Sequence, residues 1–167
     1  MGDNVKQVRA ETLVREIAGQ LGYPEEEILS LFNGAPLDFP IFFTRRLPFL
    51  VHRFGMVGIT LTARVWLLEH VIERDPVLLL ALIRHEGEHV VQQRKSPLFF
   101  YPGYLFSWFK HLFSLSPSEE LQSFRKRFGR SYAAYRAIPY EVEAYAAGDS
   151  LAERVRERVN STFKRQN

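Results

Sequence analysis

The order of apolar and polar residues along the chain predicts a series of helices and one extended region. Apolar residues recur at helical spacing over 5–21 and Gly22 follows them as a stop, so this stretch predicts a first helix. Pro24 and the three glutamates after it predict a short second helix that ends near Asn33. Proline and acidic side chains both suit a first helical turn.

Alternation of residue types singles out 59–67 as a strand. The odd-numbered positions of this stretch are Ile, Leu, Ala, Val and Leu, and the even-numbered positions are Thr, Thr, Arg and Trp. A period of two residues predicts one half-buried strand, with 49–57 as its hairpin partner. The prolines between residues 36 and 48 predict an irregular segment in which 41–43 are extended or looped.

A third helix is predicted from Pro76 to about Arg94. Asp75 is a suitable N-cap, Pro76 fits the first helical position, and the apolar run over 77–83 is too continuous for a surface helix. This helix is therefore expected to be central and buried. Two later helices are predicted, one from Ser118 onward and one over 139–158 with Gly148 as a break. Together these elements predict a mostly helical α+β fold.

Length, composition and charge limit the classes of protein to consider. A chain of 167 residues suffices for one core and is short for two, so 1–167 is expected to be a single domain. It has no cysteine, so a metal site must use nitrogen and oxygen ligands. A net charge of +3 is too small to indicate nucleic-acid binding. Residues 1–10 contain no apolar signal segment, and a cytoplasmic protein is expected.

The candidate chemistry lies in the third helix, where residues 85–89 read His-Glu-Gly-Glu-His, an HExxH pattern. Spacing of four residues places His85 and His89 about 40° apart around the helix axis, so both imidazoles can reach one metal ion. Glu86 is poorly placed as a third ligand but can take a proton from a water molecule on the metal. Polar residues inside an apolar helix are costly unless paired or coordinated, which favours metal binding.

A hydrolytic zinc site needs a third protein ligand and leaves one position open for water. That ligand must come from outside the HExxH pattern. On the residues alone, the candidates are His52, His70 and His111, or a carboxylate on another helix.

Here the sequence resembles the gluzincins, metallopeptidases whose third ligand is a glutamate on a helix downstream of HExxH. Residues 141–145 read Glu-Val-Glu-Ala-Tyr, which is similar to the family's glutamate pattern, and the resemblance extends over 58–147. It implies a zincin-like domain in which a small twisted sheet or hairpin lies over the active-site helix, with the glutamate helix behind. Residues 1–38 match no part of the family and are expected to form a helical extension.

The resemblance also implies a set of site residues. One zinc ion would be held by His85, His89 and Glu141, with Glu86 as general base. Glu143 is a rival to Glu141 that lies about 200° away around a helix, so only one of the two can face the metal. The family pattern favours Glu141.

Two positions depart from the family. Glu88 stands where an uncharged residue is usual, and Tyr145 stands where many members have an aspartate that orients a ligand histidine. Glu88 is expected to be a structural charge. Tyr132, Tyr135 and Arg136 are chemically suitable hydrogen-bond donors to an oxyanion, although packing or surface positions are the commoner roles of such residues.

The function implied is a zinc-dependent hydrolase, most simply a metallopeptidase acting on a peptide or protein substrate. The alternative is a metal-binding interaction or sensor module that is inactive or latent. Glu88 and the unmatched residues 1–38 motivate this alternative, since such an N-terminal segment could cover the cleft in a resting state.

Residues 97–113 form an unusually aromatic segment in which only Lys110 and His111 can carry a positive charge. The favoured interpretation is a core helix or loop that closes over the HExxH helix. Peripheral contact with a membrane is the alternative, because Trp and Tyr suit interfaces and basic residues lie nearby in sequence.

Overall fold

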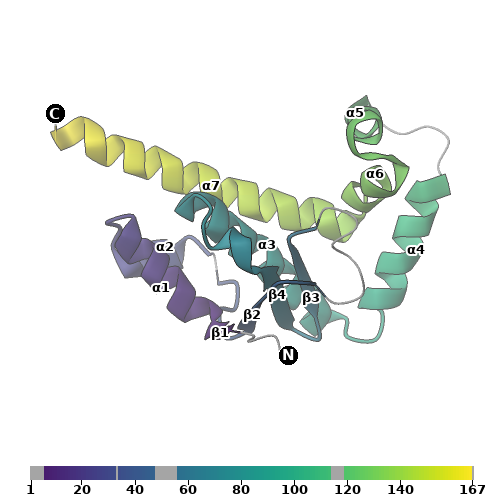
Figure 1. The fold of residues 1–167 in the computed structure, drawn as a ribbon, viewed down its shortest axis with the longest axis horizontal. Helices are drawn as coiled ribbons and strands as arrows, with labels where there is room; N and C mark the ends of the chain where they lie inside the picture. The colour runs from purple at the N-terminus through teal and green to yellow at the C-terminus, as the bar shows by residue number, and fades with distance from the viewer. Residues whose placement is uncertain (1–5, 33, 48–55, 114–118, 167) are drawn as a thin grey trace.

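The computed structural model describes residues 6–32, 34–47, 56–113 and 119–166, and Figure 1 shows their arrangement. In chain order the elements are β1 (Lys6–Arg9), α1 (Ala10–Gln20), α2 (Glu25–Ser30), β2 (Pro40–Thr44), β3 (Gly58–Leu61), β4 (Arg64–Leu68), the short 3-10 helix η2 (Glu69–Val71), α3 (Pro76–Lys95), α4 (Phe100–Phe113), α5 (Glu119–Phe128), α6 (Arg130–Arg136) and α7 (Pro139–Gln166). Helices combined with a small mixed sheet confirm the predicted α+β class.

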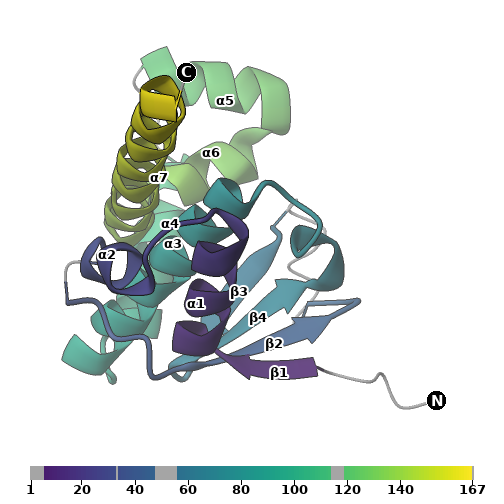
Figure 2. The same ribbon diagram turned by 90° about the vertical axis from the view of Figure 1, so that its left-hand side faces the viewer.

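The strands form one sheet in the order β1-β2-β4-β3 (Figure 2). β2 and β4 run parallel in the centre, and β1 and β3 pair antiparallel to them at the two edges. Ile41, Phe43, Val65 and Leu67 share one face of the sheet and are at most 2% exposed, because alternate side chains of a strand point the same way. They join the core formed with α1 and α3, and edge strand β3 lies beside α3.

The N-terminal segment differs from the prediction. The helix expected over 5–21 begins only at Ala10, because 6–9 form strand β1, in which Val8 pairs with Ile41 of β2. Backbone hydrogen bonds to the edge of β2 stabilise residues 6–9 as a strand, because the helical pattern over 5–9 rests only on Val5 and Val8. α1 is part of the main core, where Val14 is fully buried. The described residues of 1–38 thus supply the expected helices, α1 and α2, and in addition an edge strand, β1.

The single strand predicted over 59–67 is also wrong. Thr62 and Ala63 both have positive φ, at 49° and 56°, and form a tight turn between β3 and β4. The turn reverses the chain and shifts the alternation, so that Thr60 is buried while its apolar neighbours are only partly so. The hairpin partner predicted over 49–57 lies mostly outside the described residues, and β4 takes that role.

The two long helices, α3 and α7, pack along each other through the centre of the molecule (Figure 1). Asp75 caps α3 as predicted, because its Oδ1 accepts a hydrogen bond of 2.8 Å from the backbone N–H of Val77. Gly148 does not break α7. It permits the close approach of the helices, since a Cβ at this position would lie 2.7 Å from the carbonyl oxygen of Ala81.

α4, α5 and α6 stand together at one end of the molecule (Figure 1). The first turn of α4 contacts α3, so the favoured interpretation of 97–113 is met only in part. Phe100 is buried there, with 6.3 Å between its ring centroid and that of His89. Leu98, just before α4, and Phe106, within it, are 79% and 71% exposed. Within the described ranges, no helix is both long and apolar enough to span a membrane.

Candidate metal centre

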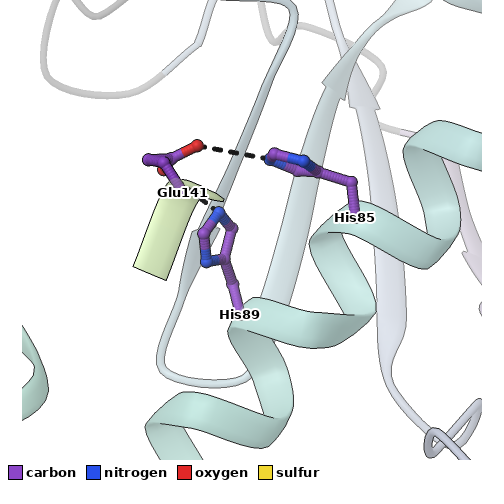
Figure 3. Close-up of side chains that lie close together, drawn as sticks. All are labelled: His85, His89 and Glu141. Carbon is purple, nitrogen blue, oxygen red and sulfur yellow. Dashed lines mark ion pairs between the residues drawn. The ribbon is translucent and has the colours of Figure 1, made fainter. Parts of the chain in front are cut away.

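His85 and His89 lie on successive turns of α3 and face Glu141 in the first turn of α7 (Figure 3). All three side chains are buried. His89 Nε2 lies 3.1 Å from Glu141 Oε1, and His85 Nε2 lies 3.5 Å from Glu141 Oε2. Their ligand atoms are all within 4.8 Å of one another, so this group can hold a metal ion.

The donor set fits a small divalent cation. Zinc binds imidazole and carboxylate groups at about 2.0 to 2.2 Å, which in tetrahedral geometry separates neighbouring ligand atoms by roughly 3.3 Å. The two nitrogen–oxygen separations, 3.1 and 3.5 Å, lie on either side of that value. Glu141 Oε2 is buried and has no hydrogen-bond partner, and a bound cation would satisfy it.

Each imidazole has a further contact besides Glu141. His89 Nδ1 lies 2.8 Å from Gln92 Oε1, which can only accept, so Nδ1 carries the proton and Nε2 is the atom left to face a metal. The Gln92 amide in turn donates to Tyr140 O at 3.1 Å. The His85 ring packs on Tyr145, with 4.4 Å between centroids. Outer hydrogen-bond partners such as Gln92 orient the imidazoles of metal sites.

Two tyrosines lie near the Glu141 carboxylate. The Tyr104 hydroxyl donates a hydrogen bond of 2.7 Å to Glu141 Oε1. Tyr135 lines the same small cavity as Glu141. Burial and the charge of Glu141 raise the pKa of Tyr104 and Tyr135 far above the ordinary value, so both hydroxyls stay protonated.

The charges of the metal-free group are coupled. Burial and the charge of His89 lower the pKa of His85 to about 3, so this imidazole is neutral. Burial alone would also lower the pKa of His89, but the hydrogen bond and charge of Glu141 outweigh it and raise that pKa to about 9. Burial opposes ionisation of Glu141, yet His89 lowers the pKa of this carboxyl to about 2. A proton shared between His89 and Glu141 thus occupies the place of a cation.

Glu86 is buried next to this group and points toward edge strand β3. Its Oε2 accepts a hydrogen bond of 2.6 Å from Thr60 Oγ1. A Cβ at Gly58 would lie 2.6 Å from Glu86 Oε1, so only glycine leaves room for the carboxylate here. Burial raises the pKa of Glu86 to about 7, against the opposing effects of the His89 charge and the Thr60 hydroxyl. The carboxyl can therefore take up and release a proton near neutral pH.

Two cavities meet at Glu86. Both are lined by Met56, Gly58, Glu86 and Tyr135. The larger, about 350 Å³, also borders His85 and extends toward Arg74. The smaller, about 210 Å³, borders His89 and Glu141 and runs between β3 and α4. Among the residues that the structure describes, none before Met56 lines either cavity.

Among the candidates for the third ligand, the structure brings Glu141 to the two histidines. The rival Glu143 is exposed, and its Oε2 accepts a hydrogen bond of 3.0 Å from Gln92. His70 is exposed in η2, and His111 lies in the last turn of α4, outside the group. His52 lies outside the described residues.

The two departures from the family pattern have local structural explanations. Glu88 forms a 2.8 Å salt bridge with Arg84, one turn earlier on α3, which agrees with a structural charge. Tyr145 packs its ring against His85 at 4.4 Å between centroids, and the Arg136 guanidinium lies 3.4 Å from the centre of the Tyr145 ring. The larger cavity is lined by Tyr132 as well as Tyr135 and Tyr145.

Sequence reasoning missed three residues of the site, namely Thr60, Gln92 and Tyr104. Gln92 follows His89 by three residues and so shares its helix face, which is a signal the sequence contains. The alternation over 59–67 predicts an exposed Thr60, because it contains no sign of the turn at Thr62. Tyr104 reaches Glu141 from another helix, and no spacing indicates such a contact.

Comparison of the chain with protein-family models, with curated proteins and with solved structures found no match.

Proposed function

We propose that the protein is a zinc-dependent hydrolase, most simply a metallopeptidase of gluzincin type. Two imidazoles and one carboxylate form a ligand set typical of hydrolytic zinc sites. The observation that carries the proposal is the position of Glu86, a buried carboxyl beside the ligand group and at the junction of two cavities. A purely structural ion pair between His89 and Glu141 would not require a second buried carboxyl beside it.

The residues have distinct roles in this proposal. When bound by His85, His89 and Glu141, a zinc ion would supply Lewis acidity toward a water molecule and a substrate carbonyl. Glu86 accepts a proton from the attacking water as the water oxygen bonds to the carbonyl carbon. It then delivers that proton to the leaving nitrogen as the C–N bond breaks, which gives a carboxylic acid and an amine. Thr60 holds the carboxylate toward β3 during both transfers.

The alternative of a latent or inactive metal-binding module has less support. Glu88, one of its two motivations, pairs with Arg84. The other motivation is cover of the cleft by residues 1–38, and the described residues 6–32 and 34–38 do not line the cavities. Glu86 and the cavities around it favour catalysis over simple metal storage or sensing.

The test is the Glu86→Gln variant, assayed for zinc content by elemental analysis and for hydrolysis of a broad peptide library. We expect the variant to retain one zinc ion per chain and to lose turnover by about 100-fold or more, because loss of general-base catalysis has effects of that size. Unchanged hydrolysis would refute the role of Glu86.

Glu88→Gln provides the matched control, since Glu88 belongs to the same pattern but pairs with Arg84. This variant should keep both its zinc and its turnover. A wild-type protein that binds zinc and cleaves no peptide in the library would favour the metal-binding module.

A further inference from the structure

α4 presents apolar side chains to solvent as well as to the protein. On its inner side Phe100 packs against His89, with 6.3 Å between ring centroids, and Tyr104 contacts Glu141. Exposed to solvent is a group that we call the α4 outer face, made of Leu98 and Phe99 in the turn just before α4 and of Leu105, Phe106, Phe109 and Phe113 within it. Its members are 45% to 79% exposed. A helix that is apolar on both sides is expected to lie against a second apolar phase.

The same region carries a net positive charge. Residues 97–137 contain six lysines or arginines and two glutamates, a formal charge of +4. The whole chain carries +3, so the remaining residues carry −1. The exposed basic side chains of this stretch are Lys110 on α4, Arg125, Lys126 and Arg127 on α5, and Arg130 at the start of α6.

The fold keeps these charges near α4. α6 packs on α4, where the Trp108 indole N–H donates a hydrogen bond of 3.3 Å to Ser131 O, and α5 packs on α6. The three helices form one end of the molecule, remote from α1 and α2 (Figure 1). An exposed apolar face and a basic cluster therefore occur on one small helical unit.

We propose that the α4 outer face docks on an anionic lipid bilayer. The helix has 14 residues, shorter than the roughly 20 needed to cross a bilayer, so it lies in the plane of the interface. The outer-face phenylalanines enter the boundary of the acyl chains. The basic residues of α5 and α6 contact the negatively charged headgroups.

Lipid suits this surface better than a protein partner does. Protein interfaces carry about one hydrogen bond per 100 to 200 Å², whereas the α4 outer face consists only of Leu and Phe side chains. A second copy of the chain is disfavoured for a different reason. A second copy would bring the same net positive charge to the contact, and like charges repel. Anionic headgroups neutralise the same charges.

The test measures binding of the full chain to vesicles by flotation, and its result does not depend on catalytic activity. The protein should bind vesicles of phosphatidylcholine mixed with phosphatidylglycerol, bind pure phosphatidylcholine more weakly, and lose binding as salt rises. Replacing Phe99 and Phe106 by Gln should weaken binding by about tenfold per side chain. Replacing Arg125 and Arg127 by Gln should weaken binding to the anionic vesicles by about fivefold per charge.

Ile72→Gln is the matched control, since Ile72 is a 43% exposed apolar residue outside this unit and its loss should leave binding unchanged. Circular dichroism checks that each variant is folded. Absence of binding to anionic vesicles would overturn the proposal, as would equal binding by the double phenylalanine variant. Self-association of the wild type that this variant abolishes, without vesicle binding, would assign the face to a second copy instead.

Discussion

Gln92 orients the imidazole of His89, which lies on the same helix, α3. Its Oε1 lies 2.8 Å from His89 Nδ1, and the side chain is only 6% exposed, so water replaces it poorly. Gln92→Leu should lower zinc affinity by about 10- to 100-fold, because an imidazole without its outer hydrogen bond is less well oriented and less basic. Competition with a chromophoric chelator measures the change.

Glu143→Gln is the control for that measurement, since it alters the Gln92 environment and leaves the Gln92–His89 hydrogen bond in place. Its zinc affinity should stay close to that of the wild type. A larger loss for Glu143→Gln than for Glu141→Gln would show that the wrong glutamate has been assigned as ligand.

The proton held by His89 makes metal binding depend on pH. The pKa of this imidazole is raised to about 9 because Glu141 outweighs the effect of burial. Below pH 9 the metal-free protein thus holds a proton that the metal-bound form must release. Zinc affinity should rise about tenfold per pH unit and level off above pH 9. Calorimetry in buffers of different ionisation enthalpy measures the released proton.

Glu141→Gln should remove this dependence near neutral pH as well as weaken binding. Without the carboxylate, burial dominates and the pKa of His89 falls below its ordinary value, so the imidazole is already neutral at pH 7. The same slope in wild type and variant would contradict the assignment of the proton to His89.

At the residue scale, the parts of the site on one helix were predictable and the parts that cross between helices were not. The spacing of His85 and His89 predicted their common face, and the placement of Glu141 came from the family resemblance. The contacts of Thr60 with Glu86 and of Tyr104 with Glu141 depend on where β3 and α4 pack. The order of residues along the chain does not specify that packing.

At the scale of elements, the metal centre depends on the distance between α3 and α7. Gly148→Ala should destabilise the protein by about 1 to 3 kcal/mol, because the new Cβ would meet the Ala81 carbonyl at 2.7 Å and the helices must move apart. Zinc affinity should fall as well, since Glu141 moves with α7 and the histidines with α3. Thermal unfolding and chelator competition measure the two effects.

Gly19→Ala in α1 is the matched control. A Cβ at Gly19 meets no atom within 4 Å, and alanine favours the helix, so this change should stabilise the protein by up to about 1 kcal/mol and leave zinc affinity unchanged. A Gly148→Ala protein as stable as the wild type would mean that α3 and α7 are not held by this close approach.

The predicted helices agree with the structure better than the predicted strand. Caps and prolines mark the start of α3 locally, and Asp75 performs the predicted role. The turn at Thr62 and Ala63 has no glycine or asparagine to announce it. Their positive φ angles are accompanied by hydrogen bonds from the backbone N–H of Thr62 to Tyr101 Oη and from that of Ala63 to Gln93 Oε1. Side chains of α3 and α4 thus impose a turn that the local sequence disfavours.

At the scale of the whole molecule, the candidate metal centre and the main core are separate. The core joins α1, β2, β4, α3 and α7 through apolar side chains such as Ile17, Ile41 and Leu80. The metal ligands lie at one end of the α3–α7 contact, and the His89–Glu141 ion pair satisfies part of their polarity without a metal. The fold should therefore persist without zinc, unlike small domains whose only core is the metal site.

Removal of zinc with a chelator should accordingly lower the midpoint of thermal unfolding while leaving a cooperative transition. With zinc at about 1,000 times its dissociation constant, linkage contributes about 4 kcal/mol, which raises the midpoint by roughly 10 °C in a chain of this size. Glu141→Gln should show little of this shift at the same zinc concentration, because it lacks one ligand. If chelation at 25 °C abolished the circular dichroism signal of the wild type, the apolar core would not be sufficient to keep the metal-free protein folded. If added zinc left the midpoint unchanged, the three residues would not form a metal site.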